Sequence, residues 1–209
     1  MITAQYCYTF LDDYHDLLLK KHVTLSQADR LRLATMTHPL RQAQFIAGRL
    51  LLQQAAKEAG YSIALTDMAI HPHGRLYLTS HLQCAASITH SYYYVAAAFS
   101  DEGELGIDSE YQKPNRPFLV IARRTFNAEQ YRWLTLLPDS RQMGAFYRLW
   151  LEKEARYKAG WKSPITGNMQ SWQDEKYAHG VWSSCPMQLF FHPVTTHQLT
   201  LQTMHDYSI

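Results

Sequence analysis

Residues 146–161 read Phe-Tyr-Arg-Leu-Trp-Leu-Glu-Lys-Glu-Ala-Arg-Tyr-Lys-Ala-Gly-Trp. Ala, Leu, Glu, Lys and Arg dominate this stretch, and all five residue types favour helix. Gly160 stands where a helix would end, because glycine is common just past a helix C-terminus. We therefore expect these residues to form the last turns of a long helix.

One face of this helix combines charged and aromatic side chains. Trp150, Glu154, Tyr157, Lys158 and Trp161 are spaced at i, i+4, i+7, i+8 and i+11, so they share that face. A face that only packs into a core seldom carries a carboxylate and an ammonium group. The simpler interpretation is an exposed i,i+4 ion pair, which stabilises a helix by roughly 0.2–0.5 kcal/mol. A second acidic stretch upstream, described below, favours a functional site.

The composition favours a folded protein that does not bind nucleic acid. The chain has 209 residues, of which 46% are hydrophobic and 18% charged, which suits one large domain or two small ones. The formal net charge of +2 is too small for a dedicated nucleic-acid binder. A mild positive balance would favour an acidic protein partner.

The three cysteines, Cys7, Cys84 and Cys185, lie far apart and form no CxxC motif. This spacing indicates neither a zinc ribbon nor a disulfide framework, so we expect a reducing compartment. No apolar run approaches the length of a membrane span, and the N-terminus lacks a basic region followed by an apolar run. The sequence therefore predicts a cytoplasmic protein with no membrane association.

Helical and stranded patterns alternate twice along the chain. In the first half, residues 10–60 are helical in pattern, and strand-like runs follow at 68–70, 76–78, 85–91 and 93–99, with one more at 105–110, just past the boundary between the halves. In the second half, helical patterns cover 117–126, 127–137 and the long helix, and strand-like runs cover 188–192 and 198–203. This order predicts an α+β fold with two halves, residues 1–102 and 103–209.

Two carboxylates stand one residue apart in Asp108-Ser-Glu110, at the end of a predicted strand. Side chains at i and i+2 of a strand point the same way, so the two acids would repel unless a cation lay between them. Hard oxygen ligands of this kind suit Mg²⁺, and Glu154 is the obvious third ligand. For an isolated DxE pattern, an ordinary solvated strand end is the simpler interpretation.

Two further stretches could contact phosphate groups. In Ser87-Ile-Thr-His-Ser91, the three hydroxyl side chains would share one strand face and His90 would lie on the other. Gly74-Arg75 follows a predicted turn. Each could equally be an ordinary turn or surface feature.

Taken in order, these stretches resemble a known enzyme family. The sequence contains Gly74-Arg75, then Ser-Ile-Thr-His90-Ser, then Gly106-Ile-Asp108-Ser-Glu110, and then Phe146-Tyr-x-Leu-Trp150-x-x-Lys153-Glu154-x-x-x-Lys158. Their order and spacing resemble the 4′-phosphopantetheinyl transferase superfamily, in particular the two-lobed Sfp-type enzymes. The resemblance runs from about residue 40 to about residue 165. Ser109 departs from it, since the family typically has an aliphatic residue between the two acids.

The resemblance implies a fold and a reaction. Members have two similar lobes related by a pseudo-twofold, each with helices packed on a mainly antiparallel sheet. Coenzyme A binds as co-substrate in the cleft between the lobes. Its 4′-phosphopantetheine arm passes to a serine of an apo acyl, polyketide or peptidyl carrier protein, which releases adenosine 3′,5′-bisphosphate. A monomer is expected, because a two-lobed chain already contains its cleft.

The resemblance also implies roles for individual residues. Asp108, Glu110 and Glu154 would hold Mg²⁺, with Mn²⁺ as an alternative ion, against the pyrophosphate. Glu154 or a metal-bound water would take the serine proton, and Lys158 would contact the phosphates.

The remaining coenzyme A contacts would come from the first half of the chain. His90 with Thr89 would bind the ribose 3′-phosphate. Arg75, next to Gly74, would replace the lysine that is usual there. Arg41 could add another phosphate contact.

Two other functions compete with this interpretation. Pro138-Asp139 and Asp174-Glu-Lys176 formally satisfy the PD…DxK pattern of metal-dependent nucleases, although that pattern is short and permissive. The other alternative is a non-catalytic protein that binds coenzyme A or a carrier protein.

Overall fold

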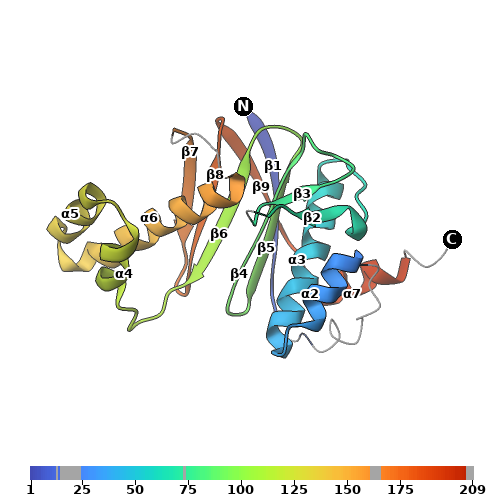
Figure 1. The fold of residues 1–209 in the computed structure, drawn as a ribbon, viewed down its shortest axis with the longest axis horizontal. Coiled ribbons are helices and arrows are strands. Elements are labelled where there is room, and N and C mark those ends of the chain that lie inside the picture. Colours follow the sequence, from blue (N-terminus) through green and yellow to red (C-terminus); the bar gives the residue numbers. More distant parts are fainter. Residues whose placement is uncertain (13, 15–24, 73, 161–165, 206–209) are drawn as a thin grey trace.

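Two sheets form the centre of the protein in the computed structural model, which describes residues 1–12, 14, 25–72, 74–160 and 166–205 (Figure 1). The first sheet has the order β4-β5-β1-β9, from β4 Ala85–Ser91, β5 Tyr94–Ser100, β1 Ile2–Phe10 and β9 Met187–Pro193. The second has the order β6-β8-β7, from β6 Leu105–Tyr111, β8 Tyr177–Ser183 and β7 Asn168–Gln173. Neighbouring strands are antiparallel except β1 and β9, which are parallel.

Helices cover the outer faces of the two sheets (Figure 1). The long helix α3, Pro39–Glu58, packs on the first sheet, and the long helix α6, Asp139–Ala159, packs on the second. The shorter elements are α2 Gln27–Ala34, α4 Phe118–Thr125, α5 Ala128–Leu136, α7 Thr196–His205, a 3₁₀ turn at Leu65–Asp67 and a ribbon of β2 Met68–Ile70 with β3 Leu76–Leu78. Within the described residues, no helix is both long enough and apolar enough to cross a membrane.

Apolar side chains are buried in successive layers. One cluster lies between α3 and the first sheet and includes Ile46, Leu50 and Phe99. A second lies between the two sheets, with Tyr6, Tyr94, Ile107 and Val181 among its members. A third, with Phe146, Leu151 and Ala178, lies between α6 and the second sheet. The order of layers is therefore helix, sheet, sheet, helix.

The α+β fold predicted from the sequence is confirmed. The strands predicted at 68–70, 76–78, 85–91, 93–99, 105–110 and 188–192 are present within a residue or two, as are the helices at 117–126 and 127–137 and the long helix. Trp161 and most of the predicted loop at 163–167 lie outside the described residues, as do residues 13 and 15–24 of the stretch predicted to be helical. The pseudo-twofold relation between the halves stays a prediction.

The strand predicted at residues 198–203 was wrong, because this segment lies in helix α7. Alternation of apolar and polar residues suggested a strand. A capping box overrides it: the backbone N–H of Gln198 donates to Thr195 Oγ1 (3.1 Å), and the backbone N–H of Thr195 donates to Gln198 Oε1 (2.7 Å). Leu199 is then buried in the cluster beneath α3.

The end of the described chain returns to the first sheet. Strand β9 pairs with β1 from Ile2↔Met187 to Tyr8↔Pro193, and α7 contacts α3. The sheet that begins at residue 2 is thus completed by residues after 186. The division into lobes at residues 102 and 103 stays a prediction.

Candidate active site

Close contact between β6 and α6 positions the predicted acidic residues. A Cβ atom built on Gly106 would lie 1.9 Å from the carbonyl oxygen of Ala155 and 2.5 Å from the backbone nitrogen of Ala159. Only glycine at this point lets the helix backbone lie directly on the strand. Asp108 and Glu110 follow at i+2 and i+4, so they share the face of β6 that is turned toward α6.

Asp108 is buried, with 6% of its surface exposed. Its Oδ1 atom accepts hydrogen bonds from Lys158 Nζ (2.7 Å) and from Thr89 Oγ1 (3.3 Å). Its Oδ2 atom is buried and has no hydrogen-bond partner among the residues that the structure describes. A buried carboxylate oxygen normally has a partner, so Oδ2 is an acceptor to which a cation or water would bind.

Glu110 is held by two donors from different elements. Its Oε1 atom accepts from Trp150 Nε1 on α6 (3.0 Å), and its Oε2 atom accepts from Arg116 Nη1 (3.1 Å) in the segment between β6 and α4. The Arg116 guanidinium also lies 5.4 Å from the centre of the Trp150 ring. Trp150 was part of the predicted helix face, whereas nothing in the sequence distinguished Arg116 from other arginines.

Glu154 is half-buried on α6. Burial raises the pKa of Glu154, and the charge of Asp108 raises it further, with a smaller contribution from Glu110; Lys158 and Lys153 act in the opposite direction. Asp108 and Glu110 are thus close enough to Glu154 to affect its protonation.

The structure does not by itself present a formed metal centre. Within the described residues, no three His, Cys, Asp or Glu side chains are grouped closely enough to hold a metal ion. Here Lys158 neutralises Asp108 and Arg116 neutralises Glu110. The chemistry of the donors nevertheless fits Mg²⁺, because all three are carboxylates and no described residue donates to Asp108 Oδ2. The metal-ligand assignment of Asp108, Glu110 and Glu154 therefore stays a prediction.

A cationic cavity of about 160 Å³ lies beside these acids. It brings together four of the predicted site residues, namely Arg41, Gly74, His90 and Lys158. Its other lining residues are Arg32, Gln44, Phe45, Arg49, Ile70, Leu76, Ser87 and Ile88. Lys158 comes from α6, whereas every other lining residue comes from the first half of the chain. Arg75 and Thr89, both within the described residues, are not among its lining residues.

His90 lies at the exposed edge of this cavity, against Arg41. Arg41 Nη1 is 2.9 Å from Nδ1 and 2.7 Å from Nε2 of His90. A guanidinium group only donates, so the imidazole nitrogen that accepts from it is unprotonated. Desolvation by the surrounding groups lowers the pKa of His90, and the positive charges of Arg41 and Lys158 lower it further. The ring is therefore neutral at pH 7, and an anion in the cavity would favour its protonation.

Sequence reasoning missed Arg32 and Arg49 as cavity residues. Arg49 is buried and makes a bidentate ion pair with Asp29, with distances of 2.6 and 2.8 Å, so its charge is already compensated. Arg32 lies on the short helix α2, whose pattern gives no signal for a site. Lys153, which belongs to the family motif, donates to the carbonyl oxygen of Thr125 at the end of α4 (3.2 Å).

Comparison with known proteins gives an independent result. The sequence model of the 4′-phosphopantetheinyl transferase superfamily matches residues 104–200, which contain all three acids and Lys158. The 4′-phosphopantetheinyl transferase AcpT of Salmonella typhi is 29% identical over 146 residues, covering 69% of this chain and 73% of the relative.

Two relatives from other bacteria match shorter segments. The 4′-phosphopantetheinyl transferase of Bacillus subtilis is 30% identical over 117 residues, covering 56% of this chain and 51% of its own length. The 4′-phosphopantetheinyl transferase HetI of a Nostoc species is 34% identical over 73 residues, covering 35% of this chain and 31% of its own length. With its paired acids on β6 and its glutamate and lysine on α6, the chain is similar to the 4′-phosphopantetheinyl transferase superfamily over residues 104–200, and to these relatives over longer or shorter segments.

Proposed function

We propose that the protein transfers the 4′-phosphopantetheine arm of coenzyme A to a serine of an apo carrier protein, in a Mg²⁺-dependent reaction that releases adenosine 3′,5′-bisphosphate. One observation carries this proposal. Lys158 lines the cationic cavity and at the same time forms an ion pair with Asp108 (2.7 Å), so an anion-binding cavity and a cluster of acids meet at one side chain.

The cavity is suited to the phosphates and the base of coenzyme A. Arg32, Arg41 and Lys158 supply positive charge, and His90 can supply more when it is protonated. The apolar part of its wall comes from Phe45, Ile70, Leu76 and Ile88. Catalysis of phosphoryl transfer depends mainly on positioning the substrate and neutralising the charge of its phosphates. The apolar side chains could position the base, and the cationic side chains could neutralise the phosphates. Arg75 and the backbone of Gly74 stay predicted contacts on the same loop.

Three acids and one lysine would act at the pyrophosphate. A divalent ion held by Asp108, Glu110 and Glu154 would neutralise charge there, as the chemistry of the carboxylates allows. Glu154 is the residue we assign as general base for the serine hydroxyl. The raised pKa of Glu154 makes it a stronger base than an ordinary carboxylate. Lys158 would balance the charge of the departing bisphosphate.

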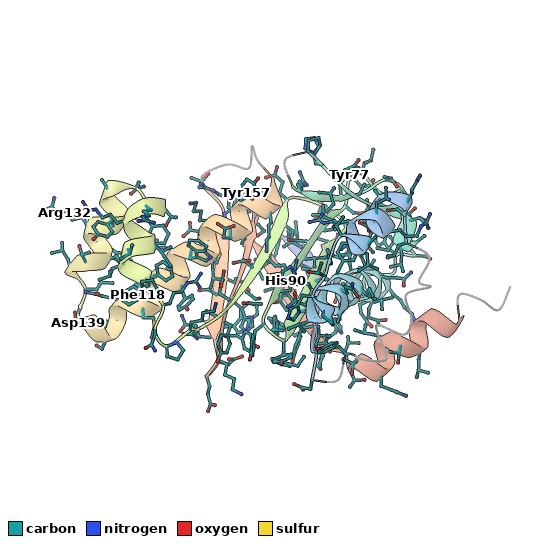
Figure 2. The ribbon with its side chains drawn as sticks, turned by 60° about the horizontal axis from the view of Figure 1, so that its bottom comes forward. Tyr77, His90, Phe118, Arg132, Asp139 and Tyr157 are labelled. Atoms are coloured by element: carbon teal, nitrogen blue, oxygen red, sulfur yellow. The ribbon has the colours of Figure 1, made fainter. Side chains whose placement is uncertain are left out.

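The partner we propose is an acidic carrier protein that approaches the end of the molecule formed by α4 and α5. Arg123, Arg124 and Arg132 are exposed there, and so are Trp133 (45%) and Leu136 (75%). Figure 2 places Arg132 at the end of the molecule, away from His90. Basic and apolar groups side by side suit an acidic amphipathic helix.

We propose a monomer, and the cytoplasm as its compartment on the basis of the cysteine content.

Intact-protein mass spectrometry tests the function directly. A panel of apo carrier proteins is incubated with coenzyme A, Mg²⁺ and the enzyme, and we expect at least one carrier to gain the mass of one phosphopantetheine arm. Mass gain that also occurs without Mg²⁺ would contradict the metal requirement. Absence of mass gain in every carrier, with coenzyme A bound, would favour the non-catalytic alternative.

Substitutions in the acid cluster test the site assignment. Asp108→Ala and Glu154→Ala should abolish the mass gain while the circular dichroism spectrum stays that of the wild type, because each removes a carboxylate that the reaction needs. Glu152→Ala is the matched control, since it removes a carboxylate from the same helix outside the predicted site. Unchanged rates in Asp108→Ala or Glu154→Ala would refute the assignment.

The nuclease alternative gains no support from the geometry. Asp174, which completes the PD…DxK pattern, accepts hydrogen bonds from the backbone N–H groups of Lys176 (2.8 Å) and Tyr177 (2.7 Å). Its carboxylate thus stabilises the turn between β7 and β8.

A further inference from the structure

Strands β4 and β6 belong to different sheets, yet three side chains join them. Ser87, Thr89 and Ser91 of β4 accept hydrogen bonds from the backbone N–H groups of successive alternate residues of β6. The distances are 3.0 Å from Ile107 to Ser87, 3.0 Å from Ser109 to Thr89 and 2.8 Å from Tyr111 to Ser91. We call Ser87, Thr89 and Ser91 the hydroxyl ladder.

Thr89 differs from the other two members of the ladder. Besides accepting from Ser109, its hydroxyl donates to Asp108 Oδ1 (3.3 Å). A hydroxyl has one proton to donate, and here that proton goes to the carboxylate. The Thr89 side chain is also buried, with 1% of the residue exposed. A phosphate could therefore reach this hydroxyl only by displacing Asp108.

Thr89 and His90 face opposite sides of β4. Successive side chains of a strand alternate between its two faces. The hydroxyl of Thr89 is turned toward β6, whereas His90 lies against Arg41 in the cationic cavity. Ser87, on the same face as Thr89, lines that cavity, but Thr89 does not. The Thr89 hydroxyl is held instead between the backbone of β6 and Asp108.

We propose that Thr89 is a positioning residue for Asp108 and does not bind the ribose 3′-phosphate. Its hydroxyl holds Oδ1 of Asp108 and ties that carboxylate to the backbone of β6, and Lys158 holds the same oxygen from α6. Together the two donors leave Oδ2 as the oxygen available to a divalent cation. This role rests on the proposed function, and it makes the hydroxyl ladder part of the acid cluster.

Metal affinity gives the first test, and it needs neither coenzyme A nor a carrier. Mn²⁺ is titrated into the wild type, Thr89→Val, Thr89→Ser and Ser91→Ala, and free Mn²⁺ is measured by electron paramagnetic resonance. We expect Thr89→Val to weaken binding about 10-fold, as is typical when a residue that orients a metal ligand is lost. Thr89→Ser should restore the wild-type affinity. Ser91→Ala, which removes a ladder bond without touching Asp108, should leave it unchanged.

Ligand discrimination gives the second test. Calorimetry compares the affinities for coenzyme A and 3′-dephospho-coenzyme A, which lacks the phosphate in question. We expect Thr89→Val to keep the wild-type ratio of the two affinities, and His90→Ala to reduce that ratio.

The outcomes separate this inference from the function on which it rests. A wild type that binds neither Mn²⁺ nor coenzyme A overturns both. If the wild type binds both, then wild-type Mn²⁺ affinity in Thr89→Val, or a lost coenzyme A preference in that variant, overturns the role of Thr89 alone. If Thr89→Val does not fold, Thr89→Ala removes the same hydroxyl and is judged by the same two measurements.

Discussion

Individual donors hold the acids of the site in place. Glu110 accepts from Trp150 Nε1 and from Arg116, and Asp108 accepts from Lys158 and Thr89. A partly buried carboxylate that loses one of its donors pays the cost of an unsatisfied charge. Each of these contacts can therefore be tested through the stability of the folded protein.

Trp150→Phe should lower the free energy of unfolding by about 1–2 kcal/mol, because it keeps an aromatic ring but removes the N–H donor to Glu110. Urea denaturation followed by circular dichroism measures the change. Trp133→Phe is the control, since Trp133 is exposed at 45%. Equal effects of the two substitutions would mean that the hydrogen bond to Glu110 contributes little.

His90 should couple ligand binding to proton uptake. Its pKa is lowered in the free protein, so folding keeps it neutral. Below about pH 6.5 the unfolded chain binds a proton at His90 and the folded chain does not, so His90 lowers the free energy of unfolding as the pH falls below that value. A phosphate bound beside His90 would instead favour the protonated imidazole. Near pH 6, coenzyme A binding should then take up protons.

Calorimetry in buffers of different ionisation enthalpy measures that uptake. His90→Gln should reduce it, because glutamine cannot be protonated. Proton uptake that is unchanged in His90→Gln would show that another group is responsible.

At the scale of elements, the contact between β6 and α6 determines how the site is assembled. Gly106 admits the backbone of Ala155 and Ala159, which brings Lys158 to Asp108 and Trp150 to Glu110 farther along the strand. Strand β6 and helix α6 run in opposite directions at this contact. Gly106 therefore fixes which side chains of α6 lie against which side chains of β6.

Gly106→Ala should destabilise the protein by about 3 kcal/mol or more, because the added Cβ would overlap backbone atoms that cannot rotate away. The loss is measurable by urea denaturation, and transferase activity should fall with it. Gly144→Ala in α6 is the matched control. The nearest atom to its added Cβ is 3.9 Å away, so that substitution should stabilise the helix by about 0.5–1 kcal/mol. A stable and active Gly106→Ala protein would contradict the proposed register.

Local patterns predicted the elements that carry the acids but not all of those that surround them. The long helix and β6 were found because their periodicity lies within a few turns or residues of sequence. Strand β8 was missed because all seven of its residues are buried, so it shows no alternation of apolar and polar side chains. Ser109 illustrates the same limit. It seemed a minor departure from the family pattern, yet its hydroxyl lies 3.0 Å from Nδ1 of His179 on β8, which only the pairing of the two strands brings near.

At the scale of the whole molecule, the sequence named candidate site residues but not their arrangement. Arg41, Gly74, His90 and Lys158 line one cavity, and their roles toward coenzyme A stay predictions. Thr89 was recognised as a member of the same motif, but its hydroxyl contacts Asp108 and the backbone of β6, and Thr89 does not line the cavity. Arg32 and Arg116 could not be predicted, because their contacts depend on how distant segments pack.

The return of β9 to β1 predicts that residues far from the site are needed to fold it. A chain that ends at Ser184 keeps Asp108, Glu110 and Glu154 and every residue that lines the cationic cavity, but it lacks β9 and α7. Because β1 would lose its partner along one edge and Tyr6 its contact with Phe191, this chain should not unfold cooperatively. Thermal denaturation and size-exclusion chromatography test this.

A chain that ends at Thr195 is the control for that truncation. It keeps β9 and removes α7 with the residues that follow it, so it should retain a cooperative transition at a lower temperature. Similar behaviour of the two truncated chains would argue against a central role for the parallel pair.

The pairing of β1 with β9 also has a consequence for synthesis on the ribosome. Strand β1 is translated before β5, and β9 is translated after both, so β5 can join β1 first. One edge of β1 then stays open to solvent while residues 101–186 are translated, until residues 187–193 emerge. The nascent chain therefore carries an unprotected β-edge between the synthesis of β5 and that of β9, a natural point of attachment for chaperones.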